Sequence, residues 1–196
     1  MRIVVSRGRG PRGYSPKGSG EPTCVMSSHE VPSADPGNCR MATSSYRVNS
    51  DDPLTEHKTC NKLLQVLARA EAEETGADEA LLVNRTGEAV TASGANIFWI
   101  SRQIVCTPPI SAGALPGITR GVVAELCEQS GLRFQECMIC ARELSSTEGV
   151  FITLSSKGIV PITKLDGAKM ALPEQIKFLQ SAYGKLLAQE CRGSGN

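Results

Sequence analysis

The sequence carries little net charge, few histidines and no long apolar run, and each scarcity excludes a class of protein. Its formal net charge of +1 gives no general attraction to nucleic acid or to membrane surfaces. No apolar run approaches the roughly 20 residues that a membrane-spanning helix needs. The basic N-terminus holds only three consecutive apolar residues, Ile3–Val5, which is too short for the core of a signal peptide. We therefore expect a cytoplasmic protein without nucleic-acid or membrane partners.

Eight cysteines are many for such a protein, but their setting favours structural thiols. Without a secretion signal, a disulfide framework is not expected. Cys137 and Cys140 form a C-x-x-C pair, yet no second pair at zinc-site spacing exists and the sequence has two histidines. Residues 132–137 alternate like a strand, on which positions three apart point to opposite faces. We expect buried thiols here and no metal site.

One stretch of the chain combines a lysine, a helix and two extended segments. Lys58 stands just before a segment with an apolar face at helical spacing, and Gly76 is placed to end that helix. The apolar face consists of Leu63, Leu64, Val66, Leu67 and Ala70. An extended segment at Glu79–Asn84 and a turn signal at Arg85–Gly87 follow. A second extended segment then leads to Asn96–Phe98.

A second string of residues is typical of an anion-binding loop. The residues from Thr107 to Pro109 close a strand, and Gly-Ala-Leu-Pro-Gly-Ile-Thr-Arg follows at Gly113–Arg120. This string leads into a predicted helix at 121–130. A helix that begins directly after a glycine-rich turn offers free backbone N–H groups to a phosphate. A simple N-cap would explain Thr119 but not the whole string.

The basic loop near the N-terminus supports two weaker interpretations and one stronger one. Gly8–Gly13 matches G-x-G-x-x-G, but the helix-breaking residues 14–20 follow where a dinucleotide site requires a helix. As a nucleic-acid arm the segment is short and lacks interleaved aromatic residues. An arginine fork suits a substrate that carries carboxylates, and Arg12 is the candidate for that contact. A solvated basic loop is the plain alternative.

Together these features resemble class IV (fold type IV) pyridoxal-phosphate-dependent enzymes, which include D-amino-acid and branched-chain aminotransferases and aminodeoxychorismate lyases. The string Ser6–Ser15 is similar to a loop of the bacterial lyases. The resemblance implies an α/β (α+β) fold of the D-amino-acid-aminotransferase type. A remnant two-layer α/β domain would span residues 1–50, with loop 6–15 on the substrate side. A barrel-like C-terminal domain that binds pyridoxal phosphate would span residues 51–196.

The resemblance also implies roles for individual residues. Lys58 would carry pyridoxal 5'-phosphate as a Schiff base and move the proton at the substrate carbon. Ile118, Thr119 and Ser155 would bind the phosphate, and Asn96 of the Asn-Ile-Phe motif would belong to the cofactor site. The lysine would need a lowered pKa so that its amine is neutral part of the time.

On the substrate side, the resemblance points to Arg12 and Tyr14. The cofactor-binding position Thr91 departs from the family, whose members carry there a glutamate that keeps the pyridine nitrogen protonated. Glu88 lies three residues away on a strand, on the opposite face, and is not expected to replace it. A threonine offers no net charge, so the ring would withdraw electrons less strongly.

Three functions remain open. The first is an enzyme resembling aminodeoxychorismate lyase, which forms 4-aminobenzoate and pyruvate in folate biosynthesis. The second is a class IV aminotransferase for branched-chain or D-amino acids. Relatives of both kinds are homodimers acting on small molecules. The third is a non-catalytic remnant, favoured by Thr91 and by the short start, which lacks the relatives' first strands and a phosphate-binding arginine.

Overall fold

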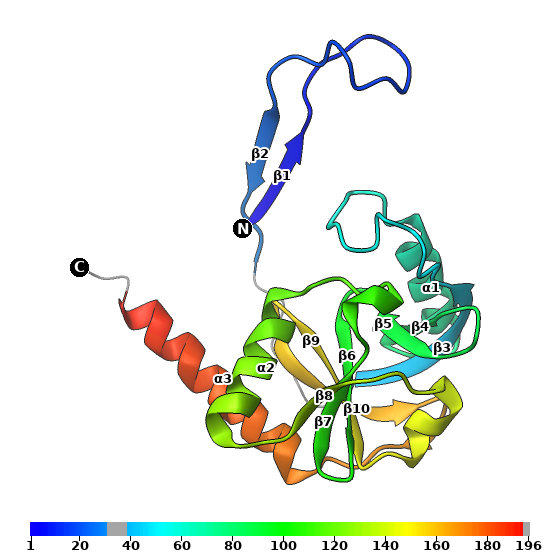
Figure 1. Ribbon diagram of the computed structural model, residues 1–196, viewed down its shortest axis with the longest axis vertical. Helices are drawn as coiled ribbons and strands as arrows, with labels where there is room; N and C mark the ends of the chain where they lie inside the picture. Colours follow the sequence, from blue (N-terminus) through cyan, green and yellow to red (C-terminus); the bar gives the residue numbers. More distant parts are fainter. Residues whose placement is uncertain (31–38, 194–196) are drawn as a thin grey trace. The chain divides into compact units, whose positions relative to one another are not determined.

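A computed structural model describes residues 1–30 and 39–193. The chain divides into two compact units, residues 1–33 and 34–196, which are described separately. The first unit is a hairpin in which β1 (Arg2–Ser6) pairs antiparallel with β2 (Thr23–Ser27), as Figure 1 shows. The connection between them contains loop 6–15, and residues 14–22 form turns and bends rather than the helix of a dinucleotide site.

The second unit is built on a curled sheet, to which the described residues contribute nine strands in the order β5–β4–β3–β10–β9–β6–β7–β8, with β11 beside β10. The strands are β3 (Cys39–Arg47), β4 (Glu79–Val83), β5 (Ala89–Ala92), β6 (Asn96–Ser101), β7 (Ile104–Thr107), β8 (Phe134–Glu136), β9 (Gly149–Leu154), β10 (Gly158–Leu165) and β11 (Ala168–Lys169). Strand β3 runs parallel to both β4 and β10. The turn at 93–95 joins β5 to β6, so the sheet curls back on itself in a barrel-like form (Figure 1).

The three α-helices cover the outer face of this curl. They are α1 (Leu63–Glu74), α2 (Ile118–Ser130) and α3 (Glu174–Gly193), with the short 3₁₀ helices η1 (Ile110–Ala112) and η2 (Ala141–Ser146). The inner face holds one apolar core around Trp99, Ile97 and Met41. On the outer face, Phe98 and Phe151 pack under α2 and α3, while α1 covers β3, β4 and β5. Among the described residues, no helix combines the length and apolar character needed to cross a membrane.

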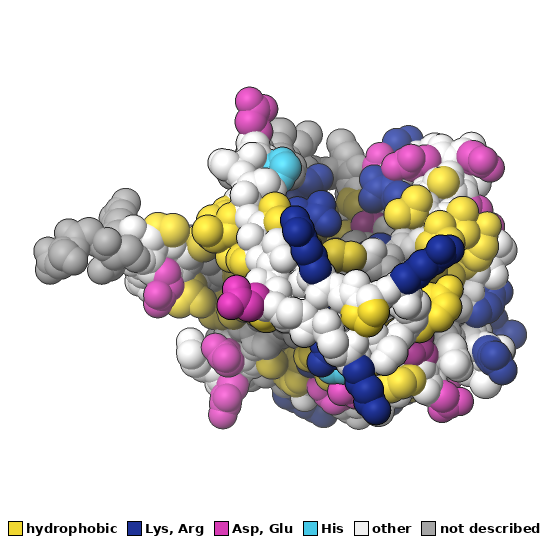
Figure 2. Space-filling view, turned by 90° about the horizontal axis from the view of Figure 1, so that it is seen from above, with side chains coloured by type: hydrophobic (Ala, Val, Ile, Leu, Met, Phe, Trp, Pro, Cys, Tyr) yellow, Lys and Arg dark blue, Asp and Glu magenta, His cyan; other side chains and the backbone are white. Residues whose placement is uncertain are grey.

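The helix α1 forms where the sequence predicts it, but it buries a different face. Gly76 ends it as expected, with φ +77° and the Ala77 N–H donating to the Ala72 carbonyl, which is a Schellman motif. Its buried residues are Ala68 and Ala72, which let the helix approach the sheet closely. The larger residues Leu63, Val66 and Leu67 are exposed, the first by 64%. Hydrophobic side chains (yellow) gather in Figure 2 on the side where Figure 1 draws α1.

Other predicted elements agree with the structure except at their ends. The helix predicted at 121–130 begins earlier, at Ile118, and the second extended segment is divided into β5 and β6. The strand predicted to reach Cys137 ends at Glu136. The predicted boundary between domains 1–50 and 51–196 stays a prediction. In the structure, β3 pairs with β4 and β10 and thus belongs to the sheet of the second unit.

Candidate functional site

The start of α2 is an unprotected helix N-terminus. Gly117 is its N-cap residue, in an extended conformation, and no side chain among the residues that the structure describes caps the helix. The first amides of any helix have no acceptor within it, so the N–H groups of Ile118 and Thr119 are available to a ligand. Together with the helix dipole, they make this end of α2 attractive to an anion.

Asn96 fixes the position of that helix start against β6. Its Nδ2 donates a hydrogen bond to the Leu115 carbonyl at 2.7 Å. A Cβ atom on Gly117 would lie 2.1 Å from the Asn96 Oδ1, so no larger residue fits without a shift. The motif residue Asn96 and the residues before α2 are therefore locked together across the outer face of the sheet.

A buried arginine ties the first turn of α2 to the neighbouring strands. The Arg120 side chain is 10% exposed, and its Nη2 lies 2.5 Å from the Glu136 Oε1 at the end of β8. The same nitrogen donates to the Pro108 carbonyl just beyond β7, at 3.1 Å. A cation near the positive end of a helix is unfavourable by itself, and the Glu136 carboxylate compensates for it.

The segment that carries Lys58 lies beside the connection that leads to α2. The Ser50 Oγ donates to the Ala112 carbonyl at 2.8 Å. Gly113 has φ +98°, and a Cβ there would lie 3.6 Å from the Thr55 Cγ2, so the two segments pack closely. Lys58 is exposed in the loop before α1. Partial burial lowers the pKa of the nearby Lys62 ammonium, and the charge of Lys58 lowers it further.

Thr91 is hydrogen-bonded within its own part of the sheet, and the nearby carboxylate of Glu88 is engaged in another turn. Thr91 lies on β5 opposite Leu82, and its Oγ1 donates to the Ala95 carbonyl at 2.9 Å. The Glu88 carboxylate accepts hydrogen bonds from the Asn84 Nδ2 and the Thr86 Oγ1 in the turn before β5. These bonds hold the pKa of Glu88 below its usual range. Glu88 is therefore engaged in shaping its own turn.

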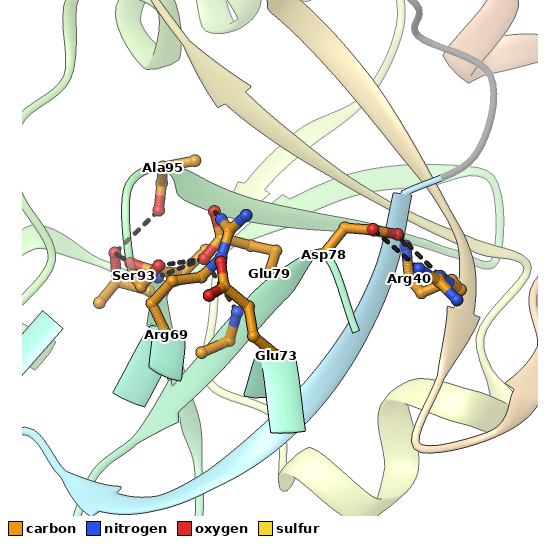
Figure 3. Close-up of polar contacts among 10 residues, drawn as sticks. Arg40, Arg69, Glu73, Asp78, Glu79, Ser93 and Ala95 are labelled. Carbon is orange, nitrogen blue, oxygen red and sulfur yellow. Dashed lines mark hydrogen bonds and ion pairs between the residues drawn. The ribbon is translucent and has the colours of Figure 1, made fainter. Parts of the chain in front are cut away.

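A second carboxylate, Glu79, is buried at the start of β4 and is also engaged. It accepts hydrogen bonds from the Ser93 N–H at 3.1 Å and from the Ser93 Oγ. The Arg69 Nη1 lies 3.3 Å from its Oε2 (Figure 3). These contacts hold the β5–β6 turn against α1, so Glu79 has a structural part in positioning that turn.

Strand β9 carries Thr153, which the sequence did not single out, and the predicted residue Ser155 follows this strand. Ser155 is exposed in the turn after β9. Thr153 lies on β9 directly opposite Asn96, is 1% exposed, and its Oγ1 has no hydrogen-bond partner among the described residues. Two-residue spacing from Ser155 was the signal that could have singled it out. Arg12 and Tyr14 lie in the first unit, both exposed in the β1–β2 connection.

The buried cysteines Cys106 and Cys127 are placed for packing rather than for reaction, whereas Cys24, Cys60 and Cys191 are exposed. Burial raises the pKa of Cys106 to about 12 and that of Cys127 to about 11, so both thiols are protonated near neutral pH. Cys137 and Cys140 are half-buried, and Cys140 caps η2. Within the residues that the structure describes, no group of three or more histidine, cysteine, aspartate or glutamate side chains could hold a metal ion.

Comparison with known proteins identifies the family. The profile of the family described as amino-transferase class IV matches residues 1–165, and the chain belongs to this family. It is 30% identical over 170 residues to the D-alanine aminotransferase of Bacillus licheniformis, covering 85% of this chain and 59% of the relative. The chain thus spans about three fifths of the length of the first curated relatives it matches.

Solved structures of two activities share the fold. The 4-amino-4-deoxychorismate lyase of Pseudomonas aeruginosa superposes with a TM-score of 0.84 at 26% identity, covering 92% of this chain and 68% of that one. The branched-chain aminotransferase of Thermoproteus uzoniensis gives a TM-score of 0.74 at 27% identity, covering 84% and 55%. The mixed α/β fold with a curled, barrel-like sheet is therefore that of the class IV enzymes.

The residues present suit one part of pyridoxal phosphate better than the other. The first amides of α2 are donors of the kind that a phosphate needs. Near Thr91, in contrast, the carboxylates of Glu79 and Glu88 are engaged elsewhere. The donors at the start of α2 thus suit a phosphate, whereas the described residues place no unengaged glutamate beside Thr91.

Proposed function

We propose that this chain is a pyridoxal-phosphate-dependent class IV enzyme of the aminodeoxychorismate lyase type. The observation that carries the proposal is the helix start at Gly117, which is uncapped and locked in place by Asn96. Such a fixed set of backbone donors costs little reorganisation when a phosphate binds. The cofactor, when bound, withdraws electrons from the substrate carbon.

The residues of the chain would divide the work. Ile118 and Thr119 would hold the phosphate through their N–H groups, and Thr119 would also add its hydroxyl. The Ser155 hydroxyl would add a donor from the turn after β9. The Lys58 Nζ would hold the cofactor covalently and then move the proton at the substrate carbon. An exposed loop position leaves this side chain free to reach its target.

The hypothesis of a lyase activity rests on loop 6–15. Its arginine-rich string suits a substrate with more than one carboxylate, and Arg12 and Tyr14 would contact that substrate. The second candidate is an amino-acid aminotransferase, which the similarity to the D-alanine and branched-chain enzymes supports equally. The class IV site serves both reactions, so the choice between them depends on the substrate.

A non-catalytic protein is the candidate of another class, and Thr91 is the feature that favours it. In that case the fold would persist without efficient chemistry at the ring. We also expect a homodimer and a cytoplasmic location from the family resemblance.

The test is a titration of the purified chain with pyridoxal phosphate, followed by absorbance near the visible edge. A new band that borohydride removes would support the enzyme, and its absence would contradict it. Release of 4-aminobenzoate from aminodeoxychorismate would identify the lyase. Formation of a keto acid from D-alanine or leucine would identify the aminotransferase instead, and a band without either reaction would support the non-catalytic candidate.

A further inference from the structure

Thr153 is the one buried side-chain hydroxyl of the described residues that lacks a hydrogen-bond partner. Leaving a buried polar group unpaired is costly, and native structures usually place such groups where something else satisfies them. The buried threonine Thr107 on β7 of the same sheet shows the usual pattern, because its Oγ1 donates to the Ile97 carbonyl at 2.8 Å. Thr153 therefore requires an explanation that its own fold does not supply.

The register of the sheet directs Thr153 towards the start of α2. Thr153 on β9 pairs with Asn96 on β6, and paired residues share one face of a sheet. Asn96 reaches the Leu115 carbonyl and lies against Gly117 on that face. Phe151, two residues before Thr153 on the same face of β9, belongs to the outer core with Val123 and Leu126 of α2. The unpartnered hydroxyl thus lies beneath the N-terminal end of the helix.

The neighbouring polar groups leave the Thr153 hydroxyl free to serve a ligand. The Asn96 amide is occupied by the Leu115 carbonyl, so it does not satisfy Thr153. A threonine hydroxyl supplies one donor, and phosphate oxygens are acceptors that bind such donors strongly. We propose that the Thr153 hydroxyl is a further phosphate-binding group of this site, donating directly to a phosphate oxygen. The inference rests on the proposed function and adds to it a donor from the floor of the site.

The experiment compares three variants of the full chain. Thr153→Val keeps the shape of the side chain and removes the hydroxyl, Thr153→Ser keeps the hydroxyl, and Thr107→Val removes a partnered hydroxyl as the matched control. Without ligand, Thr107→Val should lower the melting temperature, because it leaves the Ile97 carbonyl unpaired. Thr153→Val should leave it unchanged or raise it, because no bond is lost.

In ligand binding, Thr153→Val should be the more strongly affected of the two variants. Thr153→Val should weaken binding of pyridoxal phosphate and of inorganic phosphate by about tenfold or more, the scale of a hydrogen bond to a charged group. It should leave the binding of pyridoxal, which lacks the phosphate, within about twofold of the parent. Thr153→Ser and Thr107→Val should bind all three probes like the parent.

Unchanged phosphate affinity in Thr153→Val would overturn the inference, as would a loss of stability without ligand equal to that of Thr107→Val. A parent chain that binds inorganic phosphate but not pyridoxal phosphate would refute the proposed function. The assignment of Thr153 as a phosphate-binding residue would remain intact. A parent chain that binds neither probe would overturn both.

Discussion

The two ends of the candidate site are built in opposite ways. At the start of α2 the polar groups are available: the helix is uncapped, and the Thr153 hydroxyl on β9 has no partner within the part of the chain that the structure describes. Around β4 and β5 the polar groups are hydrogen-bonded within the protein itself. The Thr91 hydroxyl donates to Ala95, and the Glu79 carboxylate is held by Ser93.

This difference separates binding from chemistry. A phosphate can be held by backbone amides and hydroxyls without any charged side chain. A nearby carboxylate favours protonation of a ring nitrogen, because its negative charge raises the pKa of that nitrogen. The chain therefore should bind the cofactor better than it activates it, and each end of the site can be altered without the other.

The largest effect should come from removing the reactive amine. Lys58→Ala should abolish borohydride-stable labelling by pyridoxal phosphate, because no amine remains at that place in the loop. Lys62→Ala is the matched control, since burial and Lys58 also lower the pKa of Lys62. Peptide mapping checks the site, and a label that persists in Lys58→Ala and disappears in Lys62→Ala would assign the role to Lys62.

Replacing Arg120 should loosen the phosphate end as a whole. Arg120→Met leaves the partly buried Glu136 unpaired and should lower the free energy of unfolding by about 2–3 kcal/mol, below the full value for a buried pair because Glu136 is 43% exposed. Urea unfolding measures this loss. Lys177→Met breaks the exposed pair with Glu174 and should cost at most about 0.5 kcal/mol. Equal losses in both variants would show that the position of Arg120 carries no special weight.

Single hydroxyls at the phosphate end should have smaller effects. Thr119→Ala should weaken cofactor binding by about 1–2 kcal/mol, the scale of a charge-assisted hydrogen bond. Ser155→Ala should weaken it less, because its hydroxyl stands in an exposed turn. Equilibrium titration measures both affinities. If both variants bind like the parent, these side chains serve capping and packing instead.

Changing the β5 end should affect the rate rather than the affinity. Thr91→Glu should raise turnover by about tenfold, or about 1.4 kcal/mol of barrier, if the new carboxylate reaches the ring nitrogen. Thr91→Gln has nearly the same size without the charge and should not raise it. Steady-state rates and cofactor titrations separate the two quantities. A gain in both variants would point to size rather than charge.

The smallest expected effect concerns pH and a contact far from either end. The Ser44 Oγ donates to the Glu71 Oε2 at 2.5 Å, and this bond with the Ser45 N–H holds the pKa of Glu71 below its ordinary value of 4.5. A carboxylate with a lowered pKa in the folded state stabilises the fold above about pH 4.5. That stabilisation is lost as the pH falls through the lower folded value.

Urea unfolding between about pH 6 and pH 3 measures this contribution. The difference in stability between the parent and Glu71→Gln should shrink as the pH falls. Ser44→Ala should flatten the profile in the same way, because it removes the main donor. A difference that stays constant over this range would exclude a titrating contact at Glu71.

Local signals account for most of what the sequence predicts correctly. Gly76 ends α1 because a left-handed residue completes the Schellman motif, and Gly87 turns the chain between β4 and β5 with φ +83°. The Gly117–Arg120 string predicts the start of an anion-binding helix. These features depend on a few consecutive residues, so they can be recognised without knowing the fold.

Features that depend on distant partners could not be predicted in this way. The exposed side of α1 carries Leu63 and Val66, because alanines give the closer contact with the sheet. The lack of a partner for Thr153 depends on which strand lies beside β9. The sequence identifies Arg120 as the last residue of the Gly117–Arg120 string. Its pairing with Glu136 forms only when α2 and β8 are packed together.

The parallel pairing of β3 with β10 has a consequence for how the chain folds. These strands lie far apart in sequence. For example, the Thr43 N–H donates a hydrogen bond to the Asp166 carboxylate, 123 positions away. Closing such a large loop is entropically costly, and folds dominated by distant contacts form slowly. During synthesis, the edge of β3 that pairs with β10 remains unpaired until β10 has been synthesised. The order in which the chain leaves the ribosome thus makes this edge its main point of exposure to aggregation.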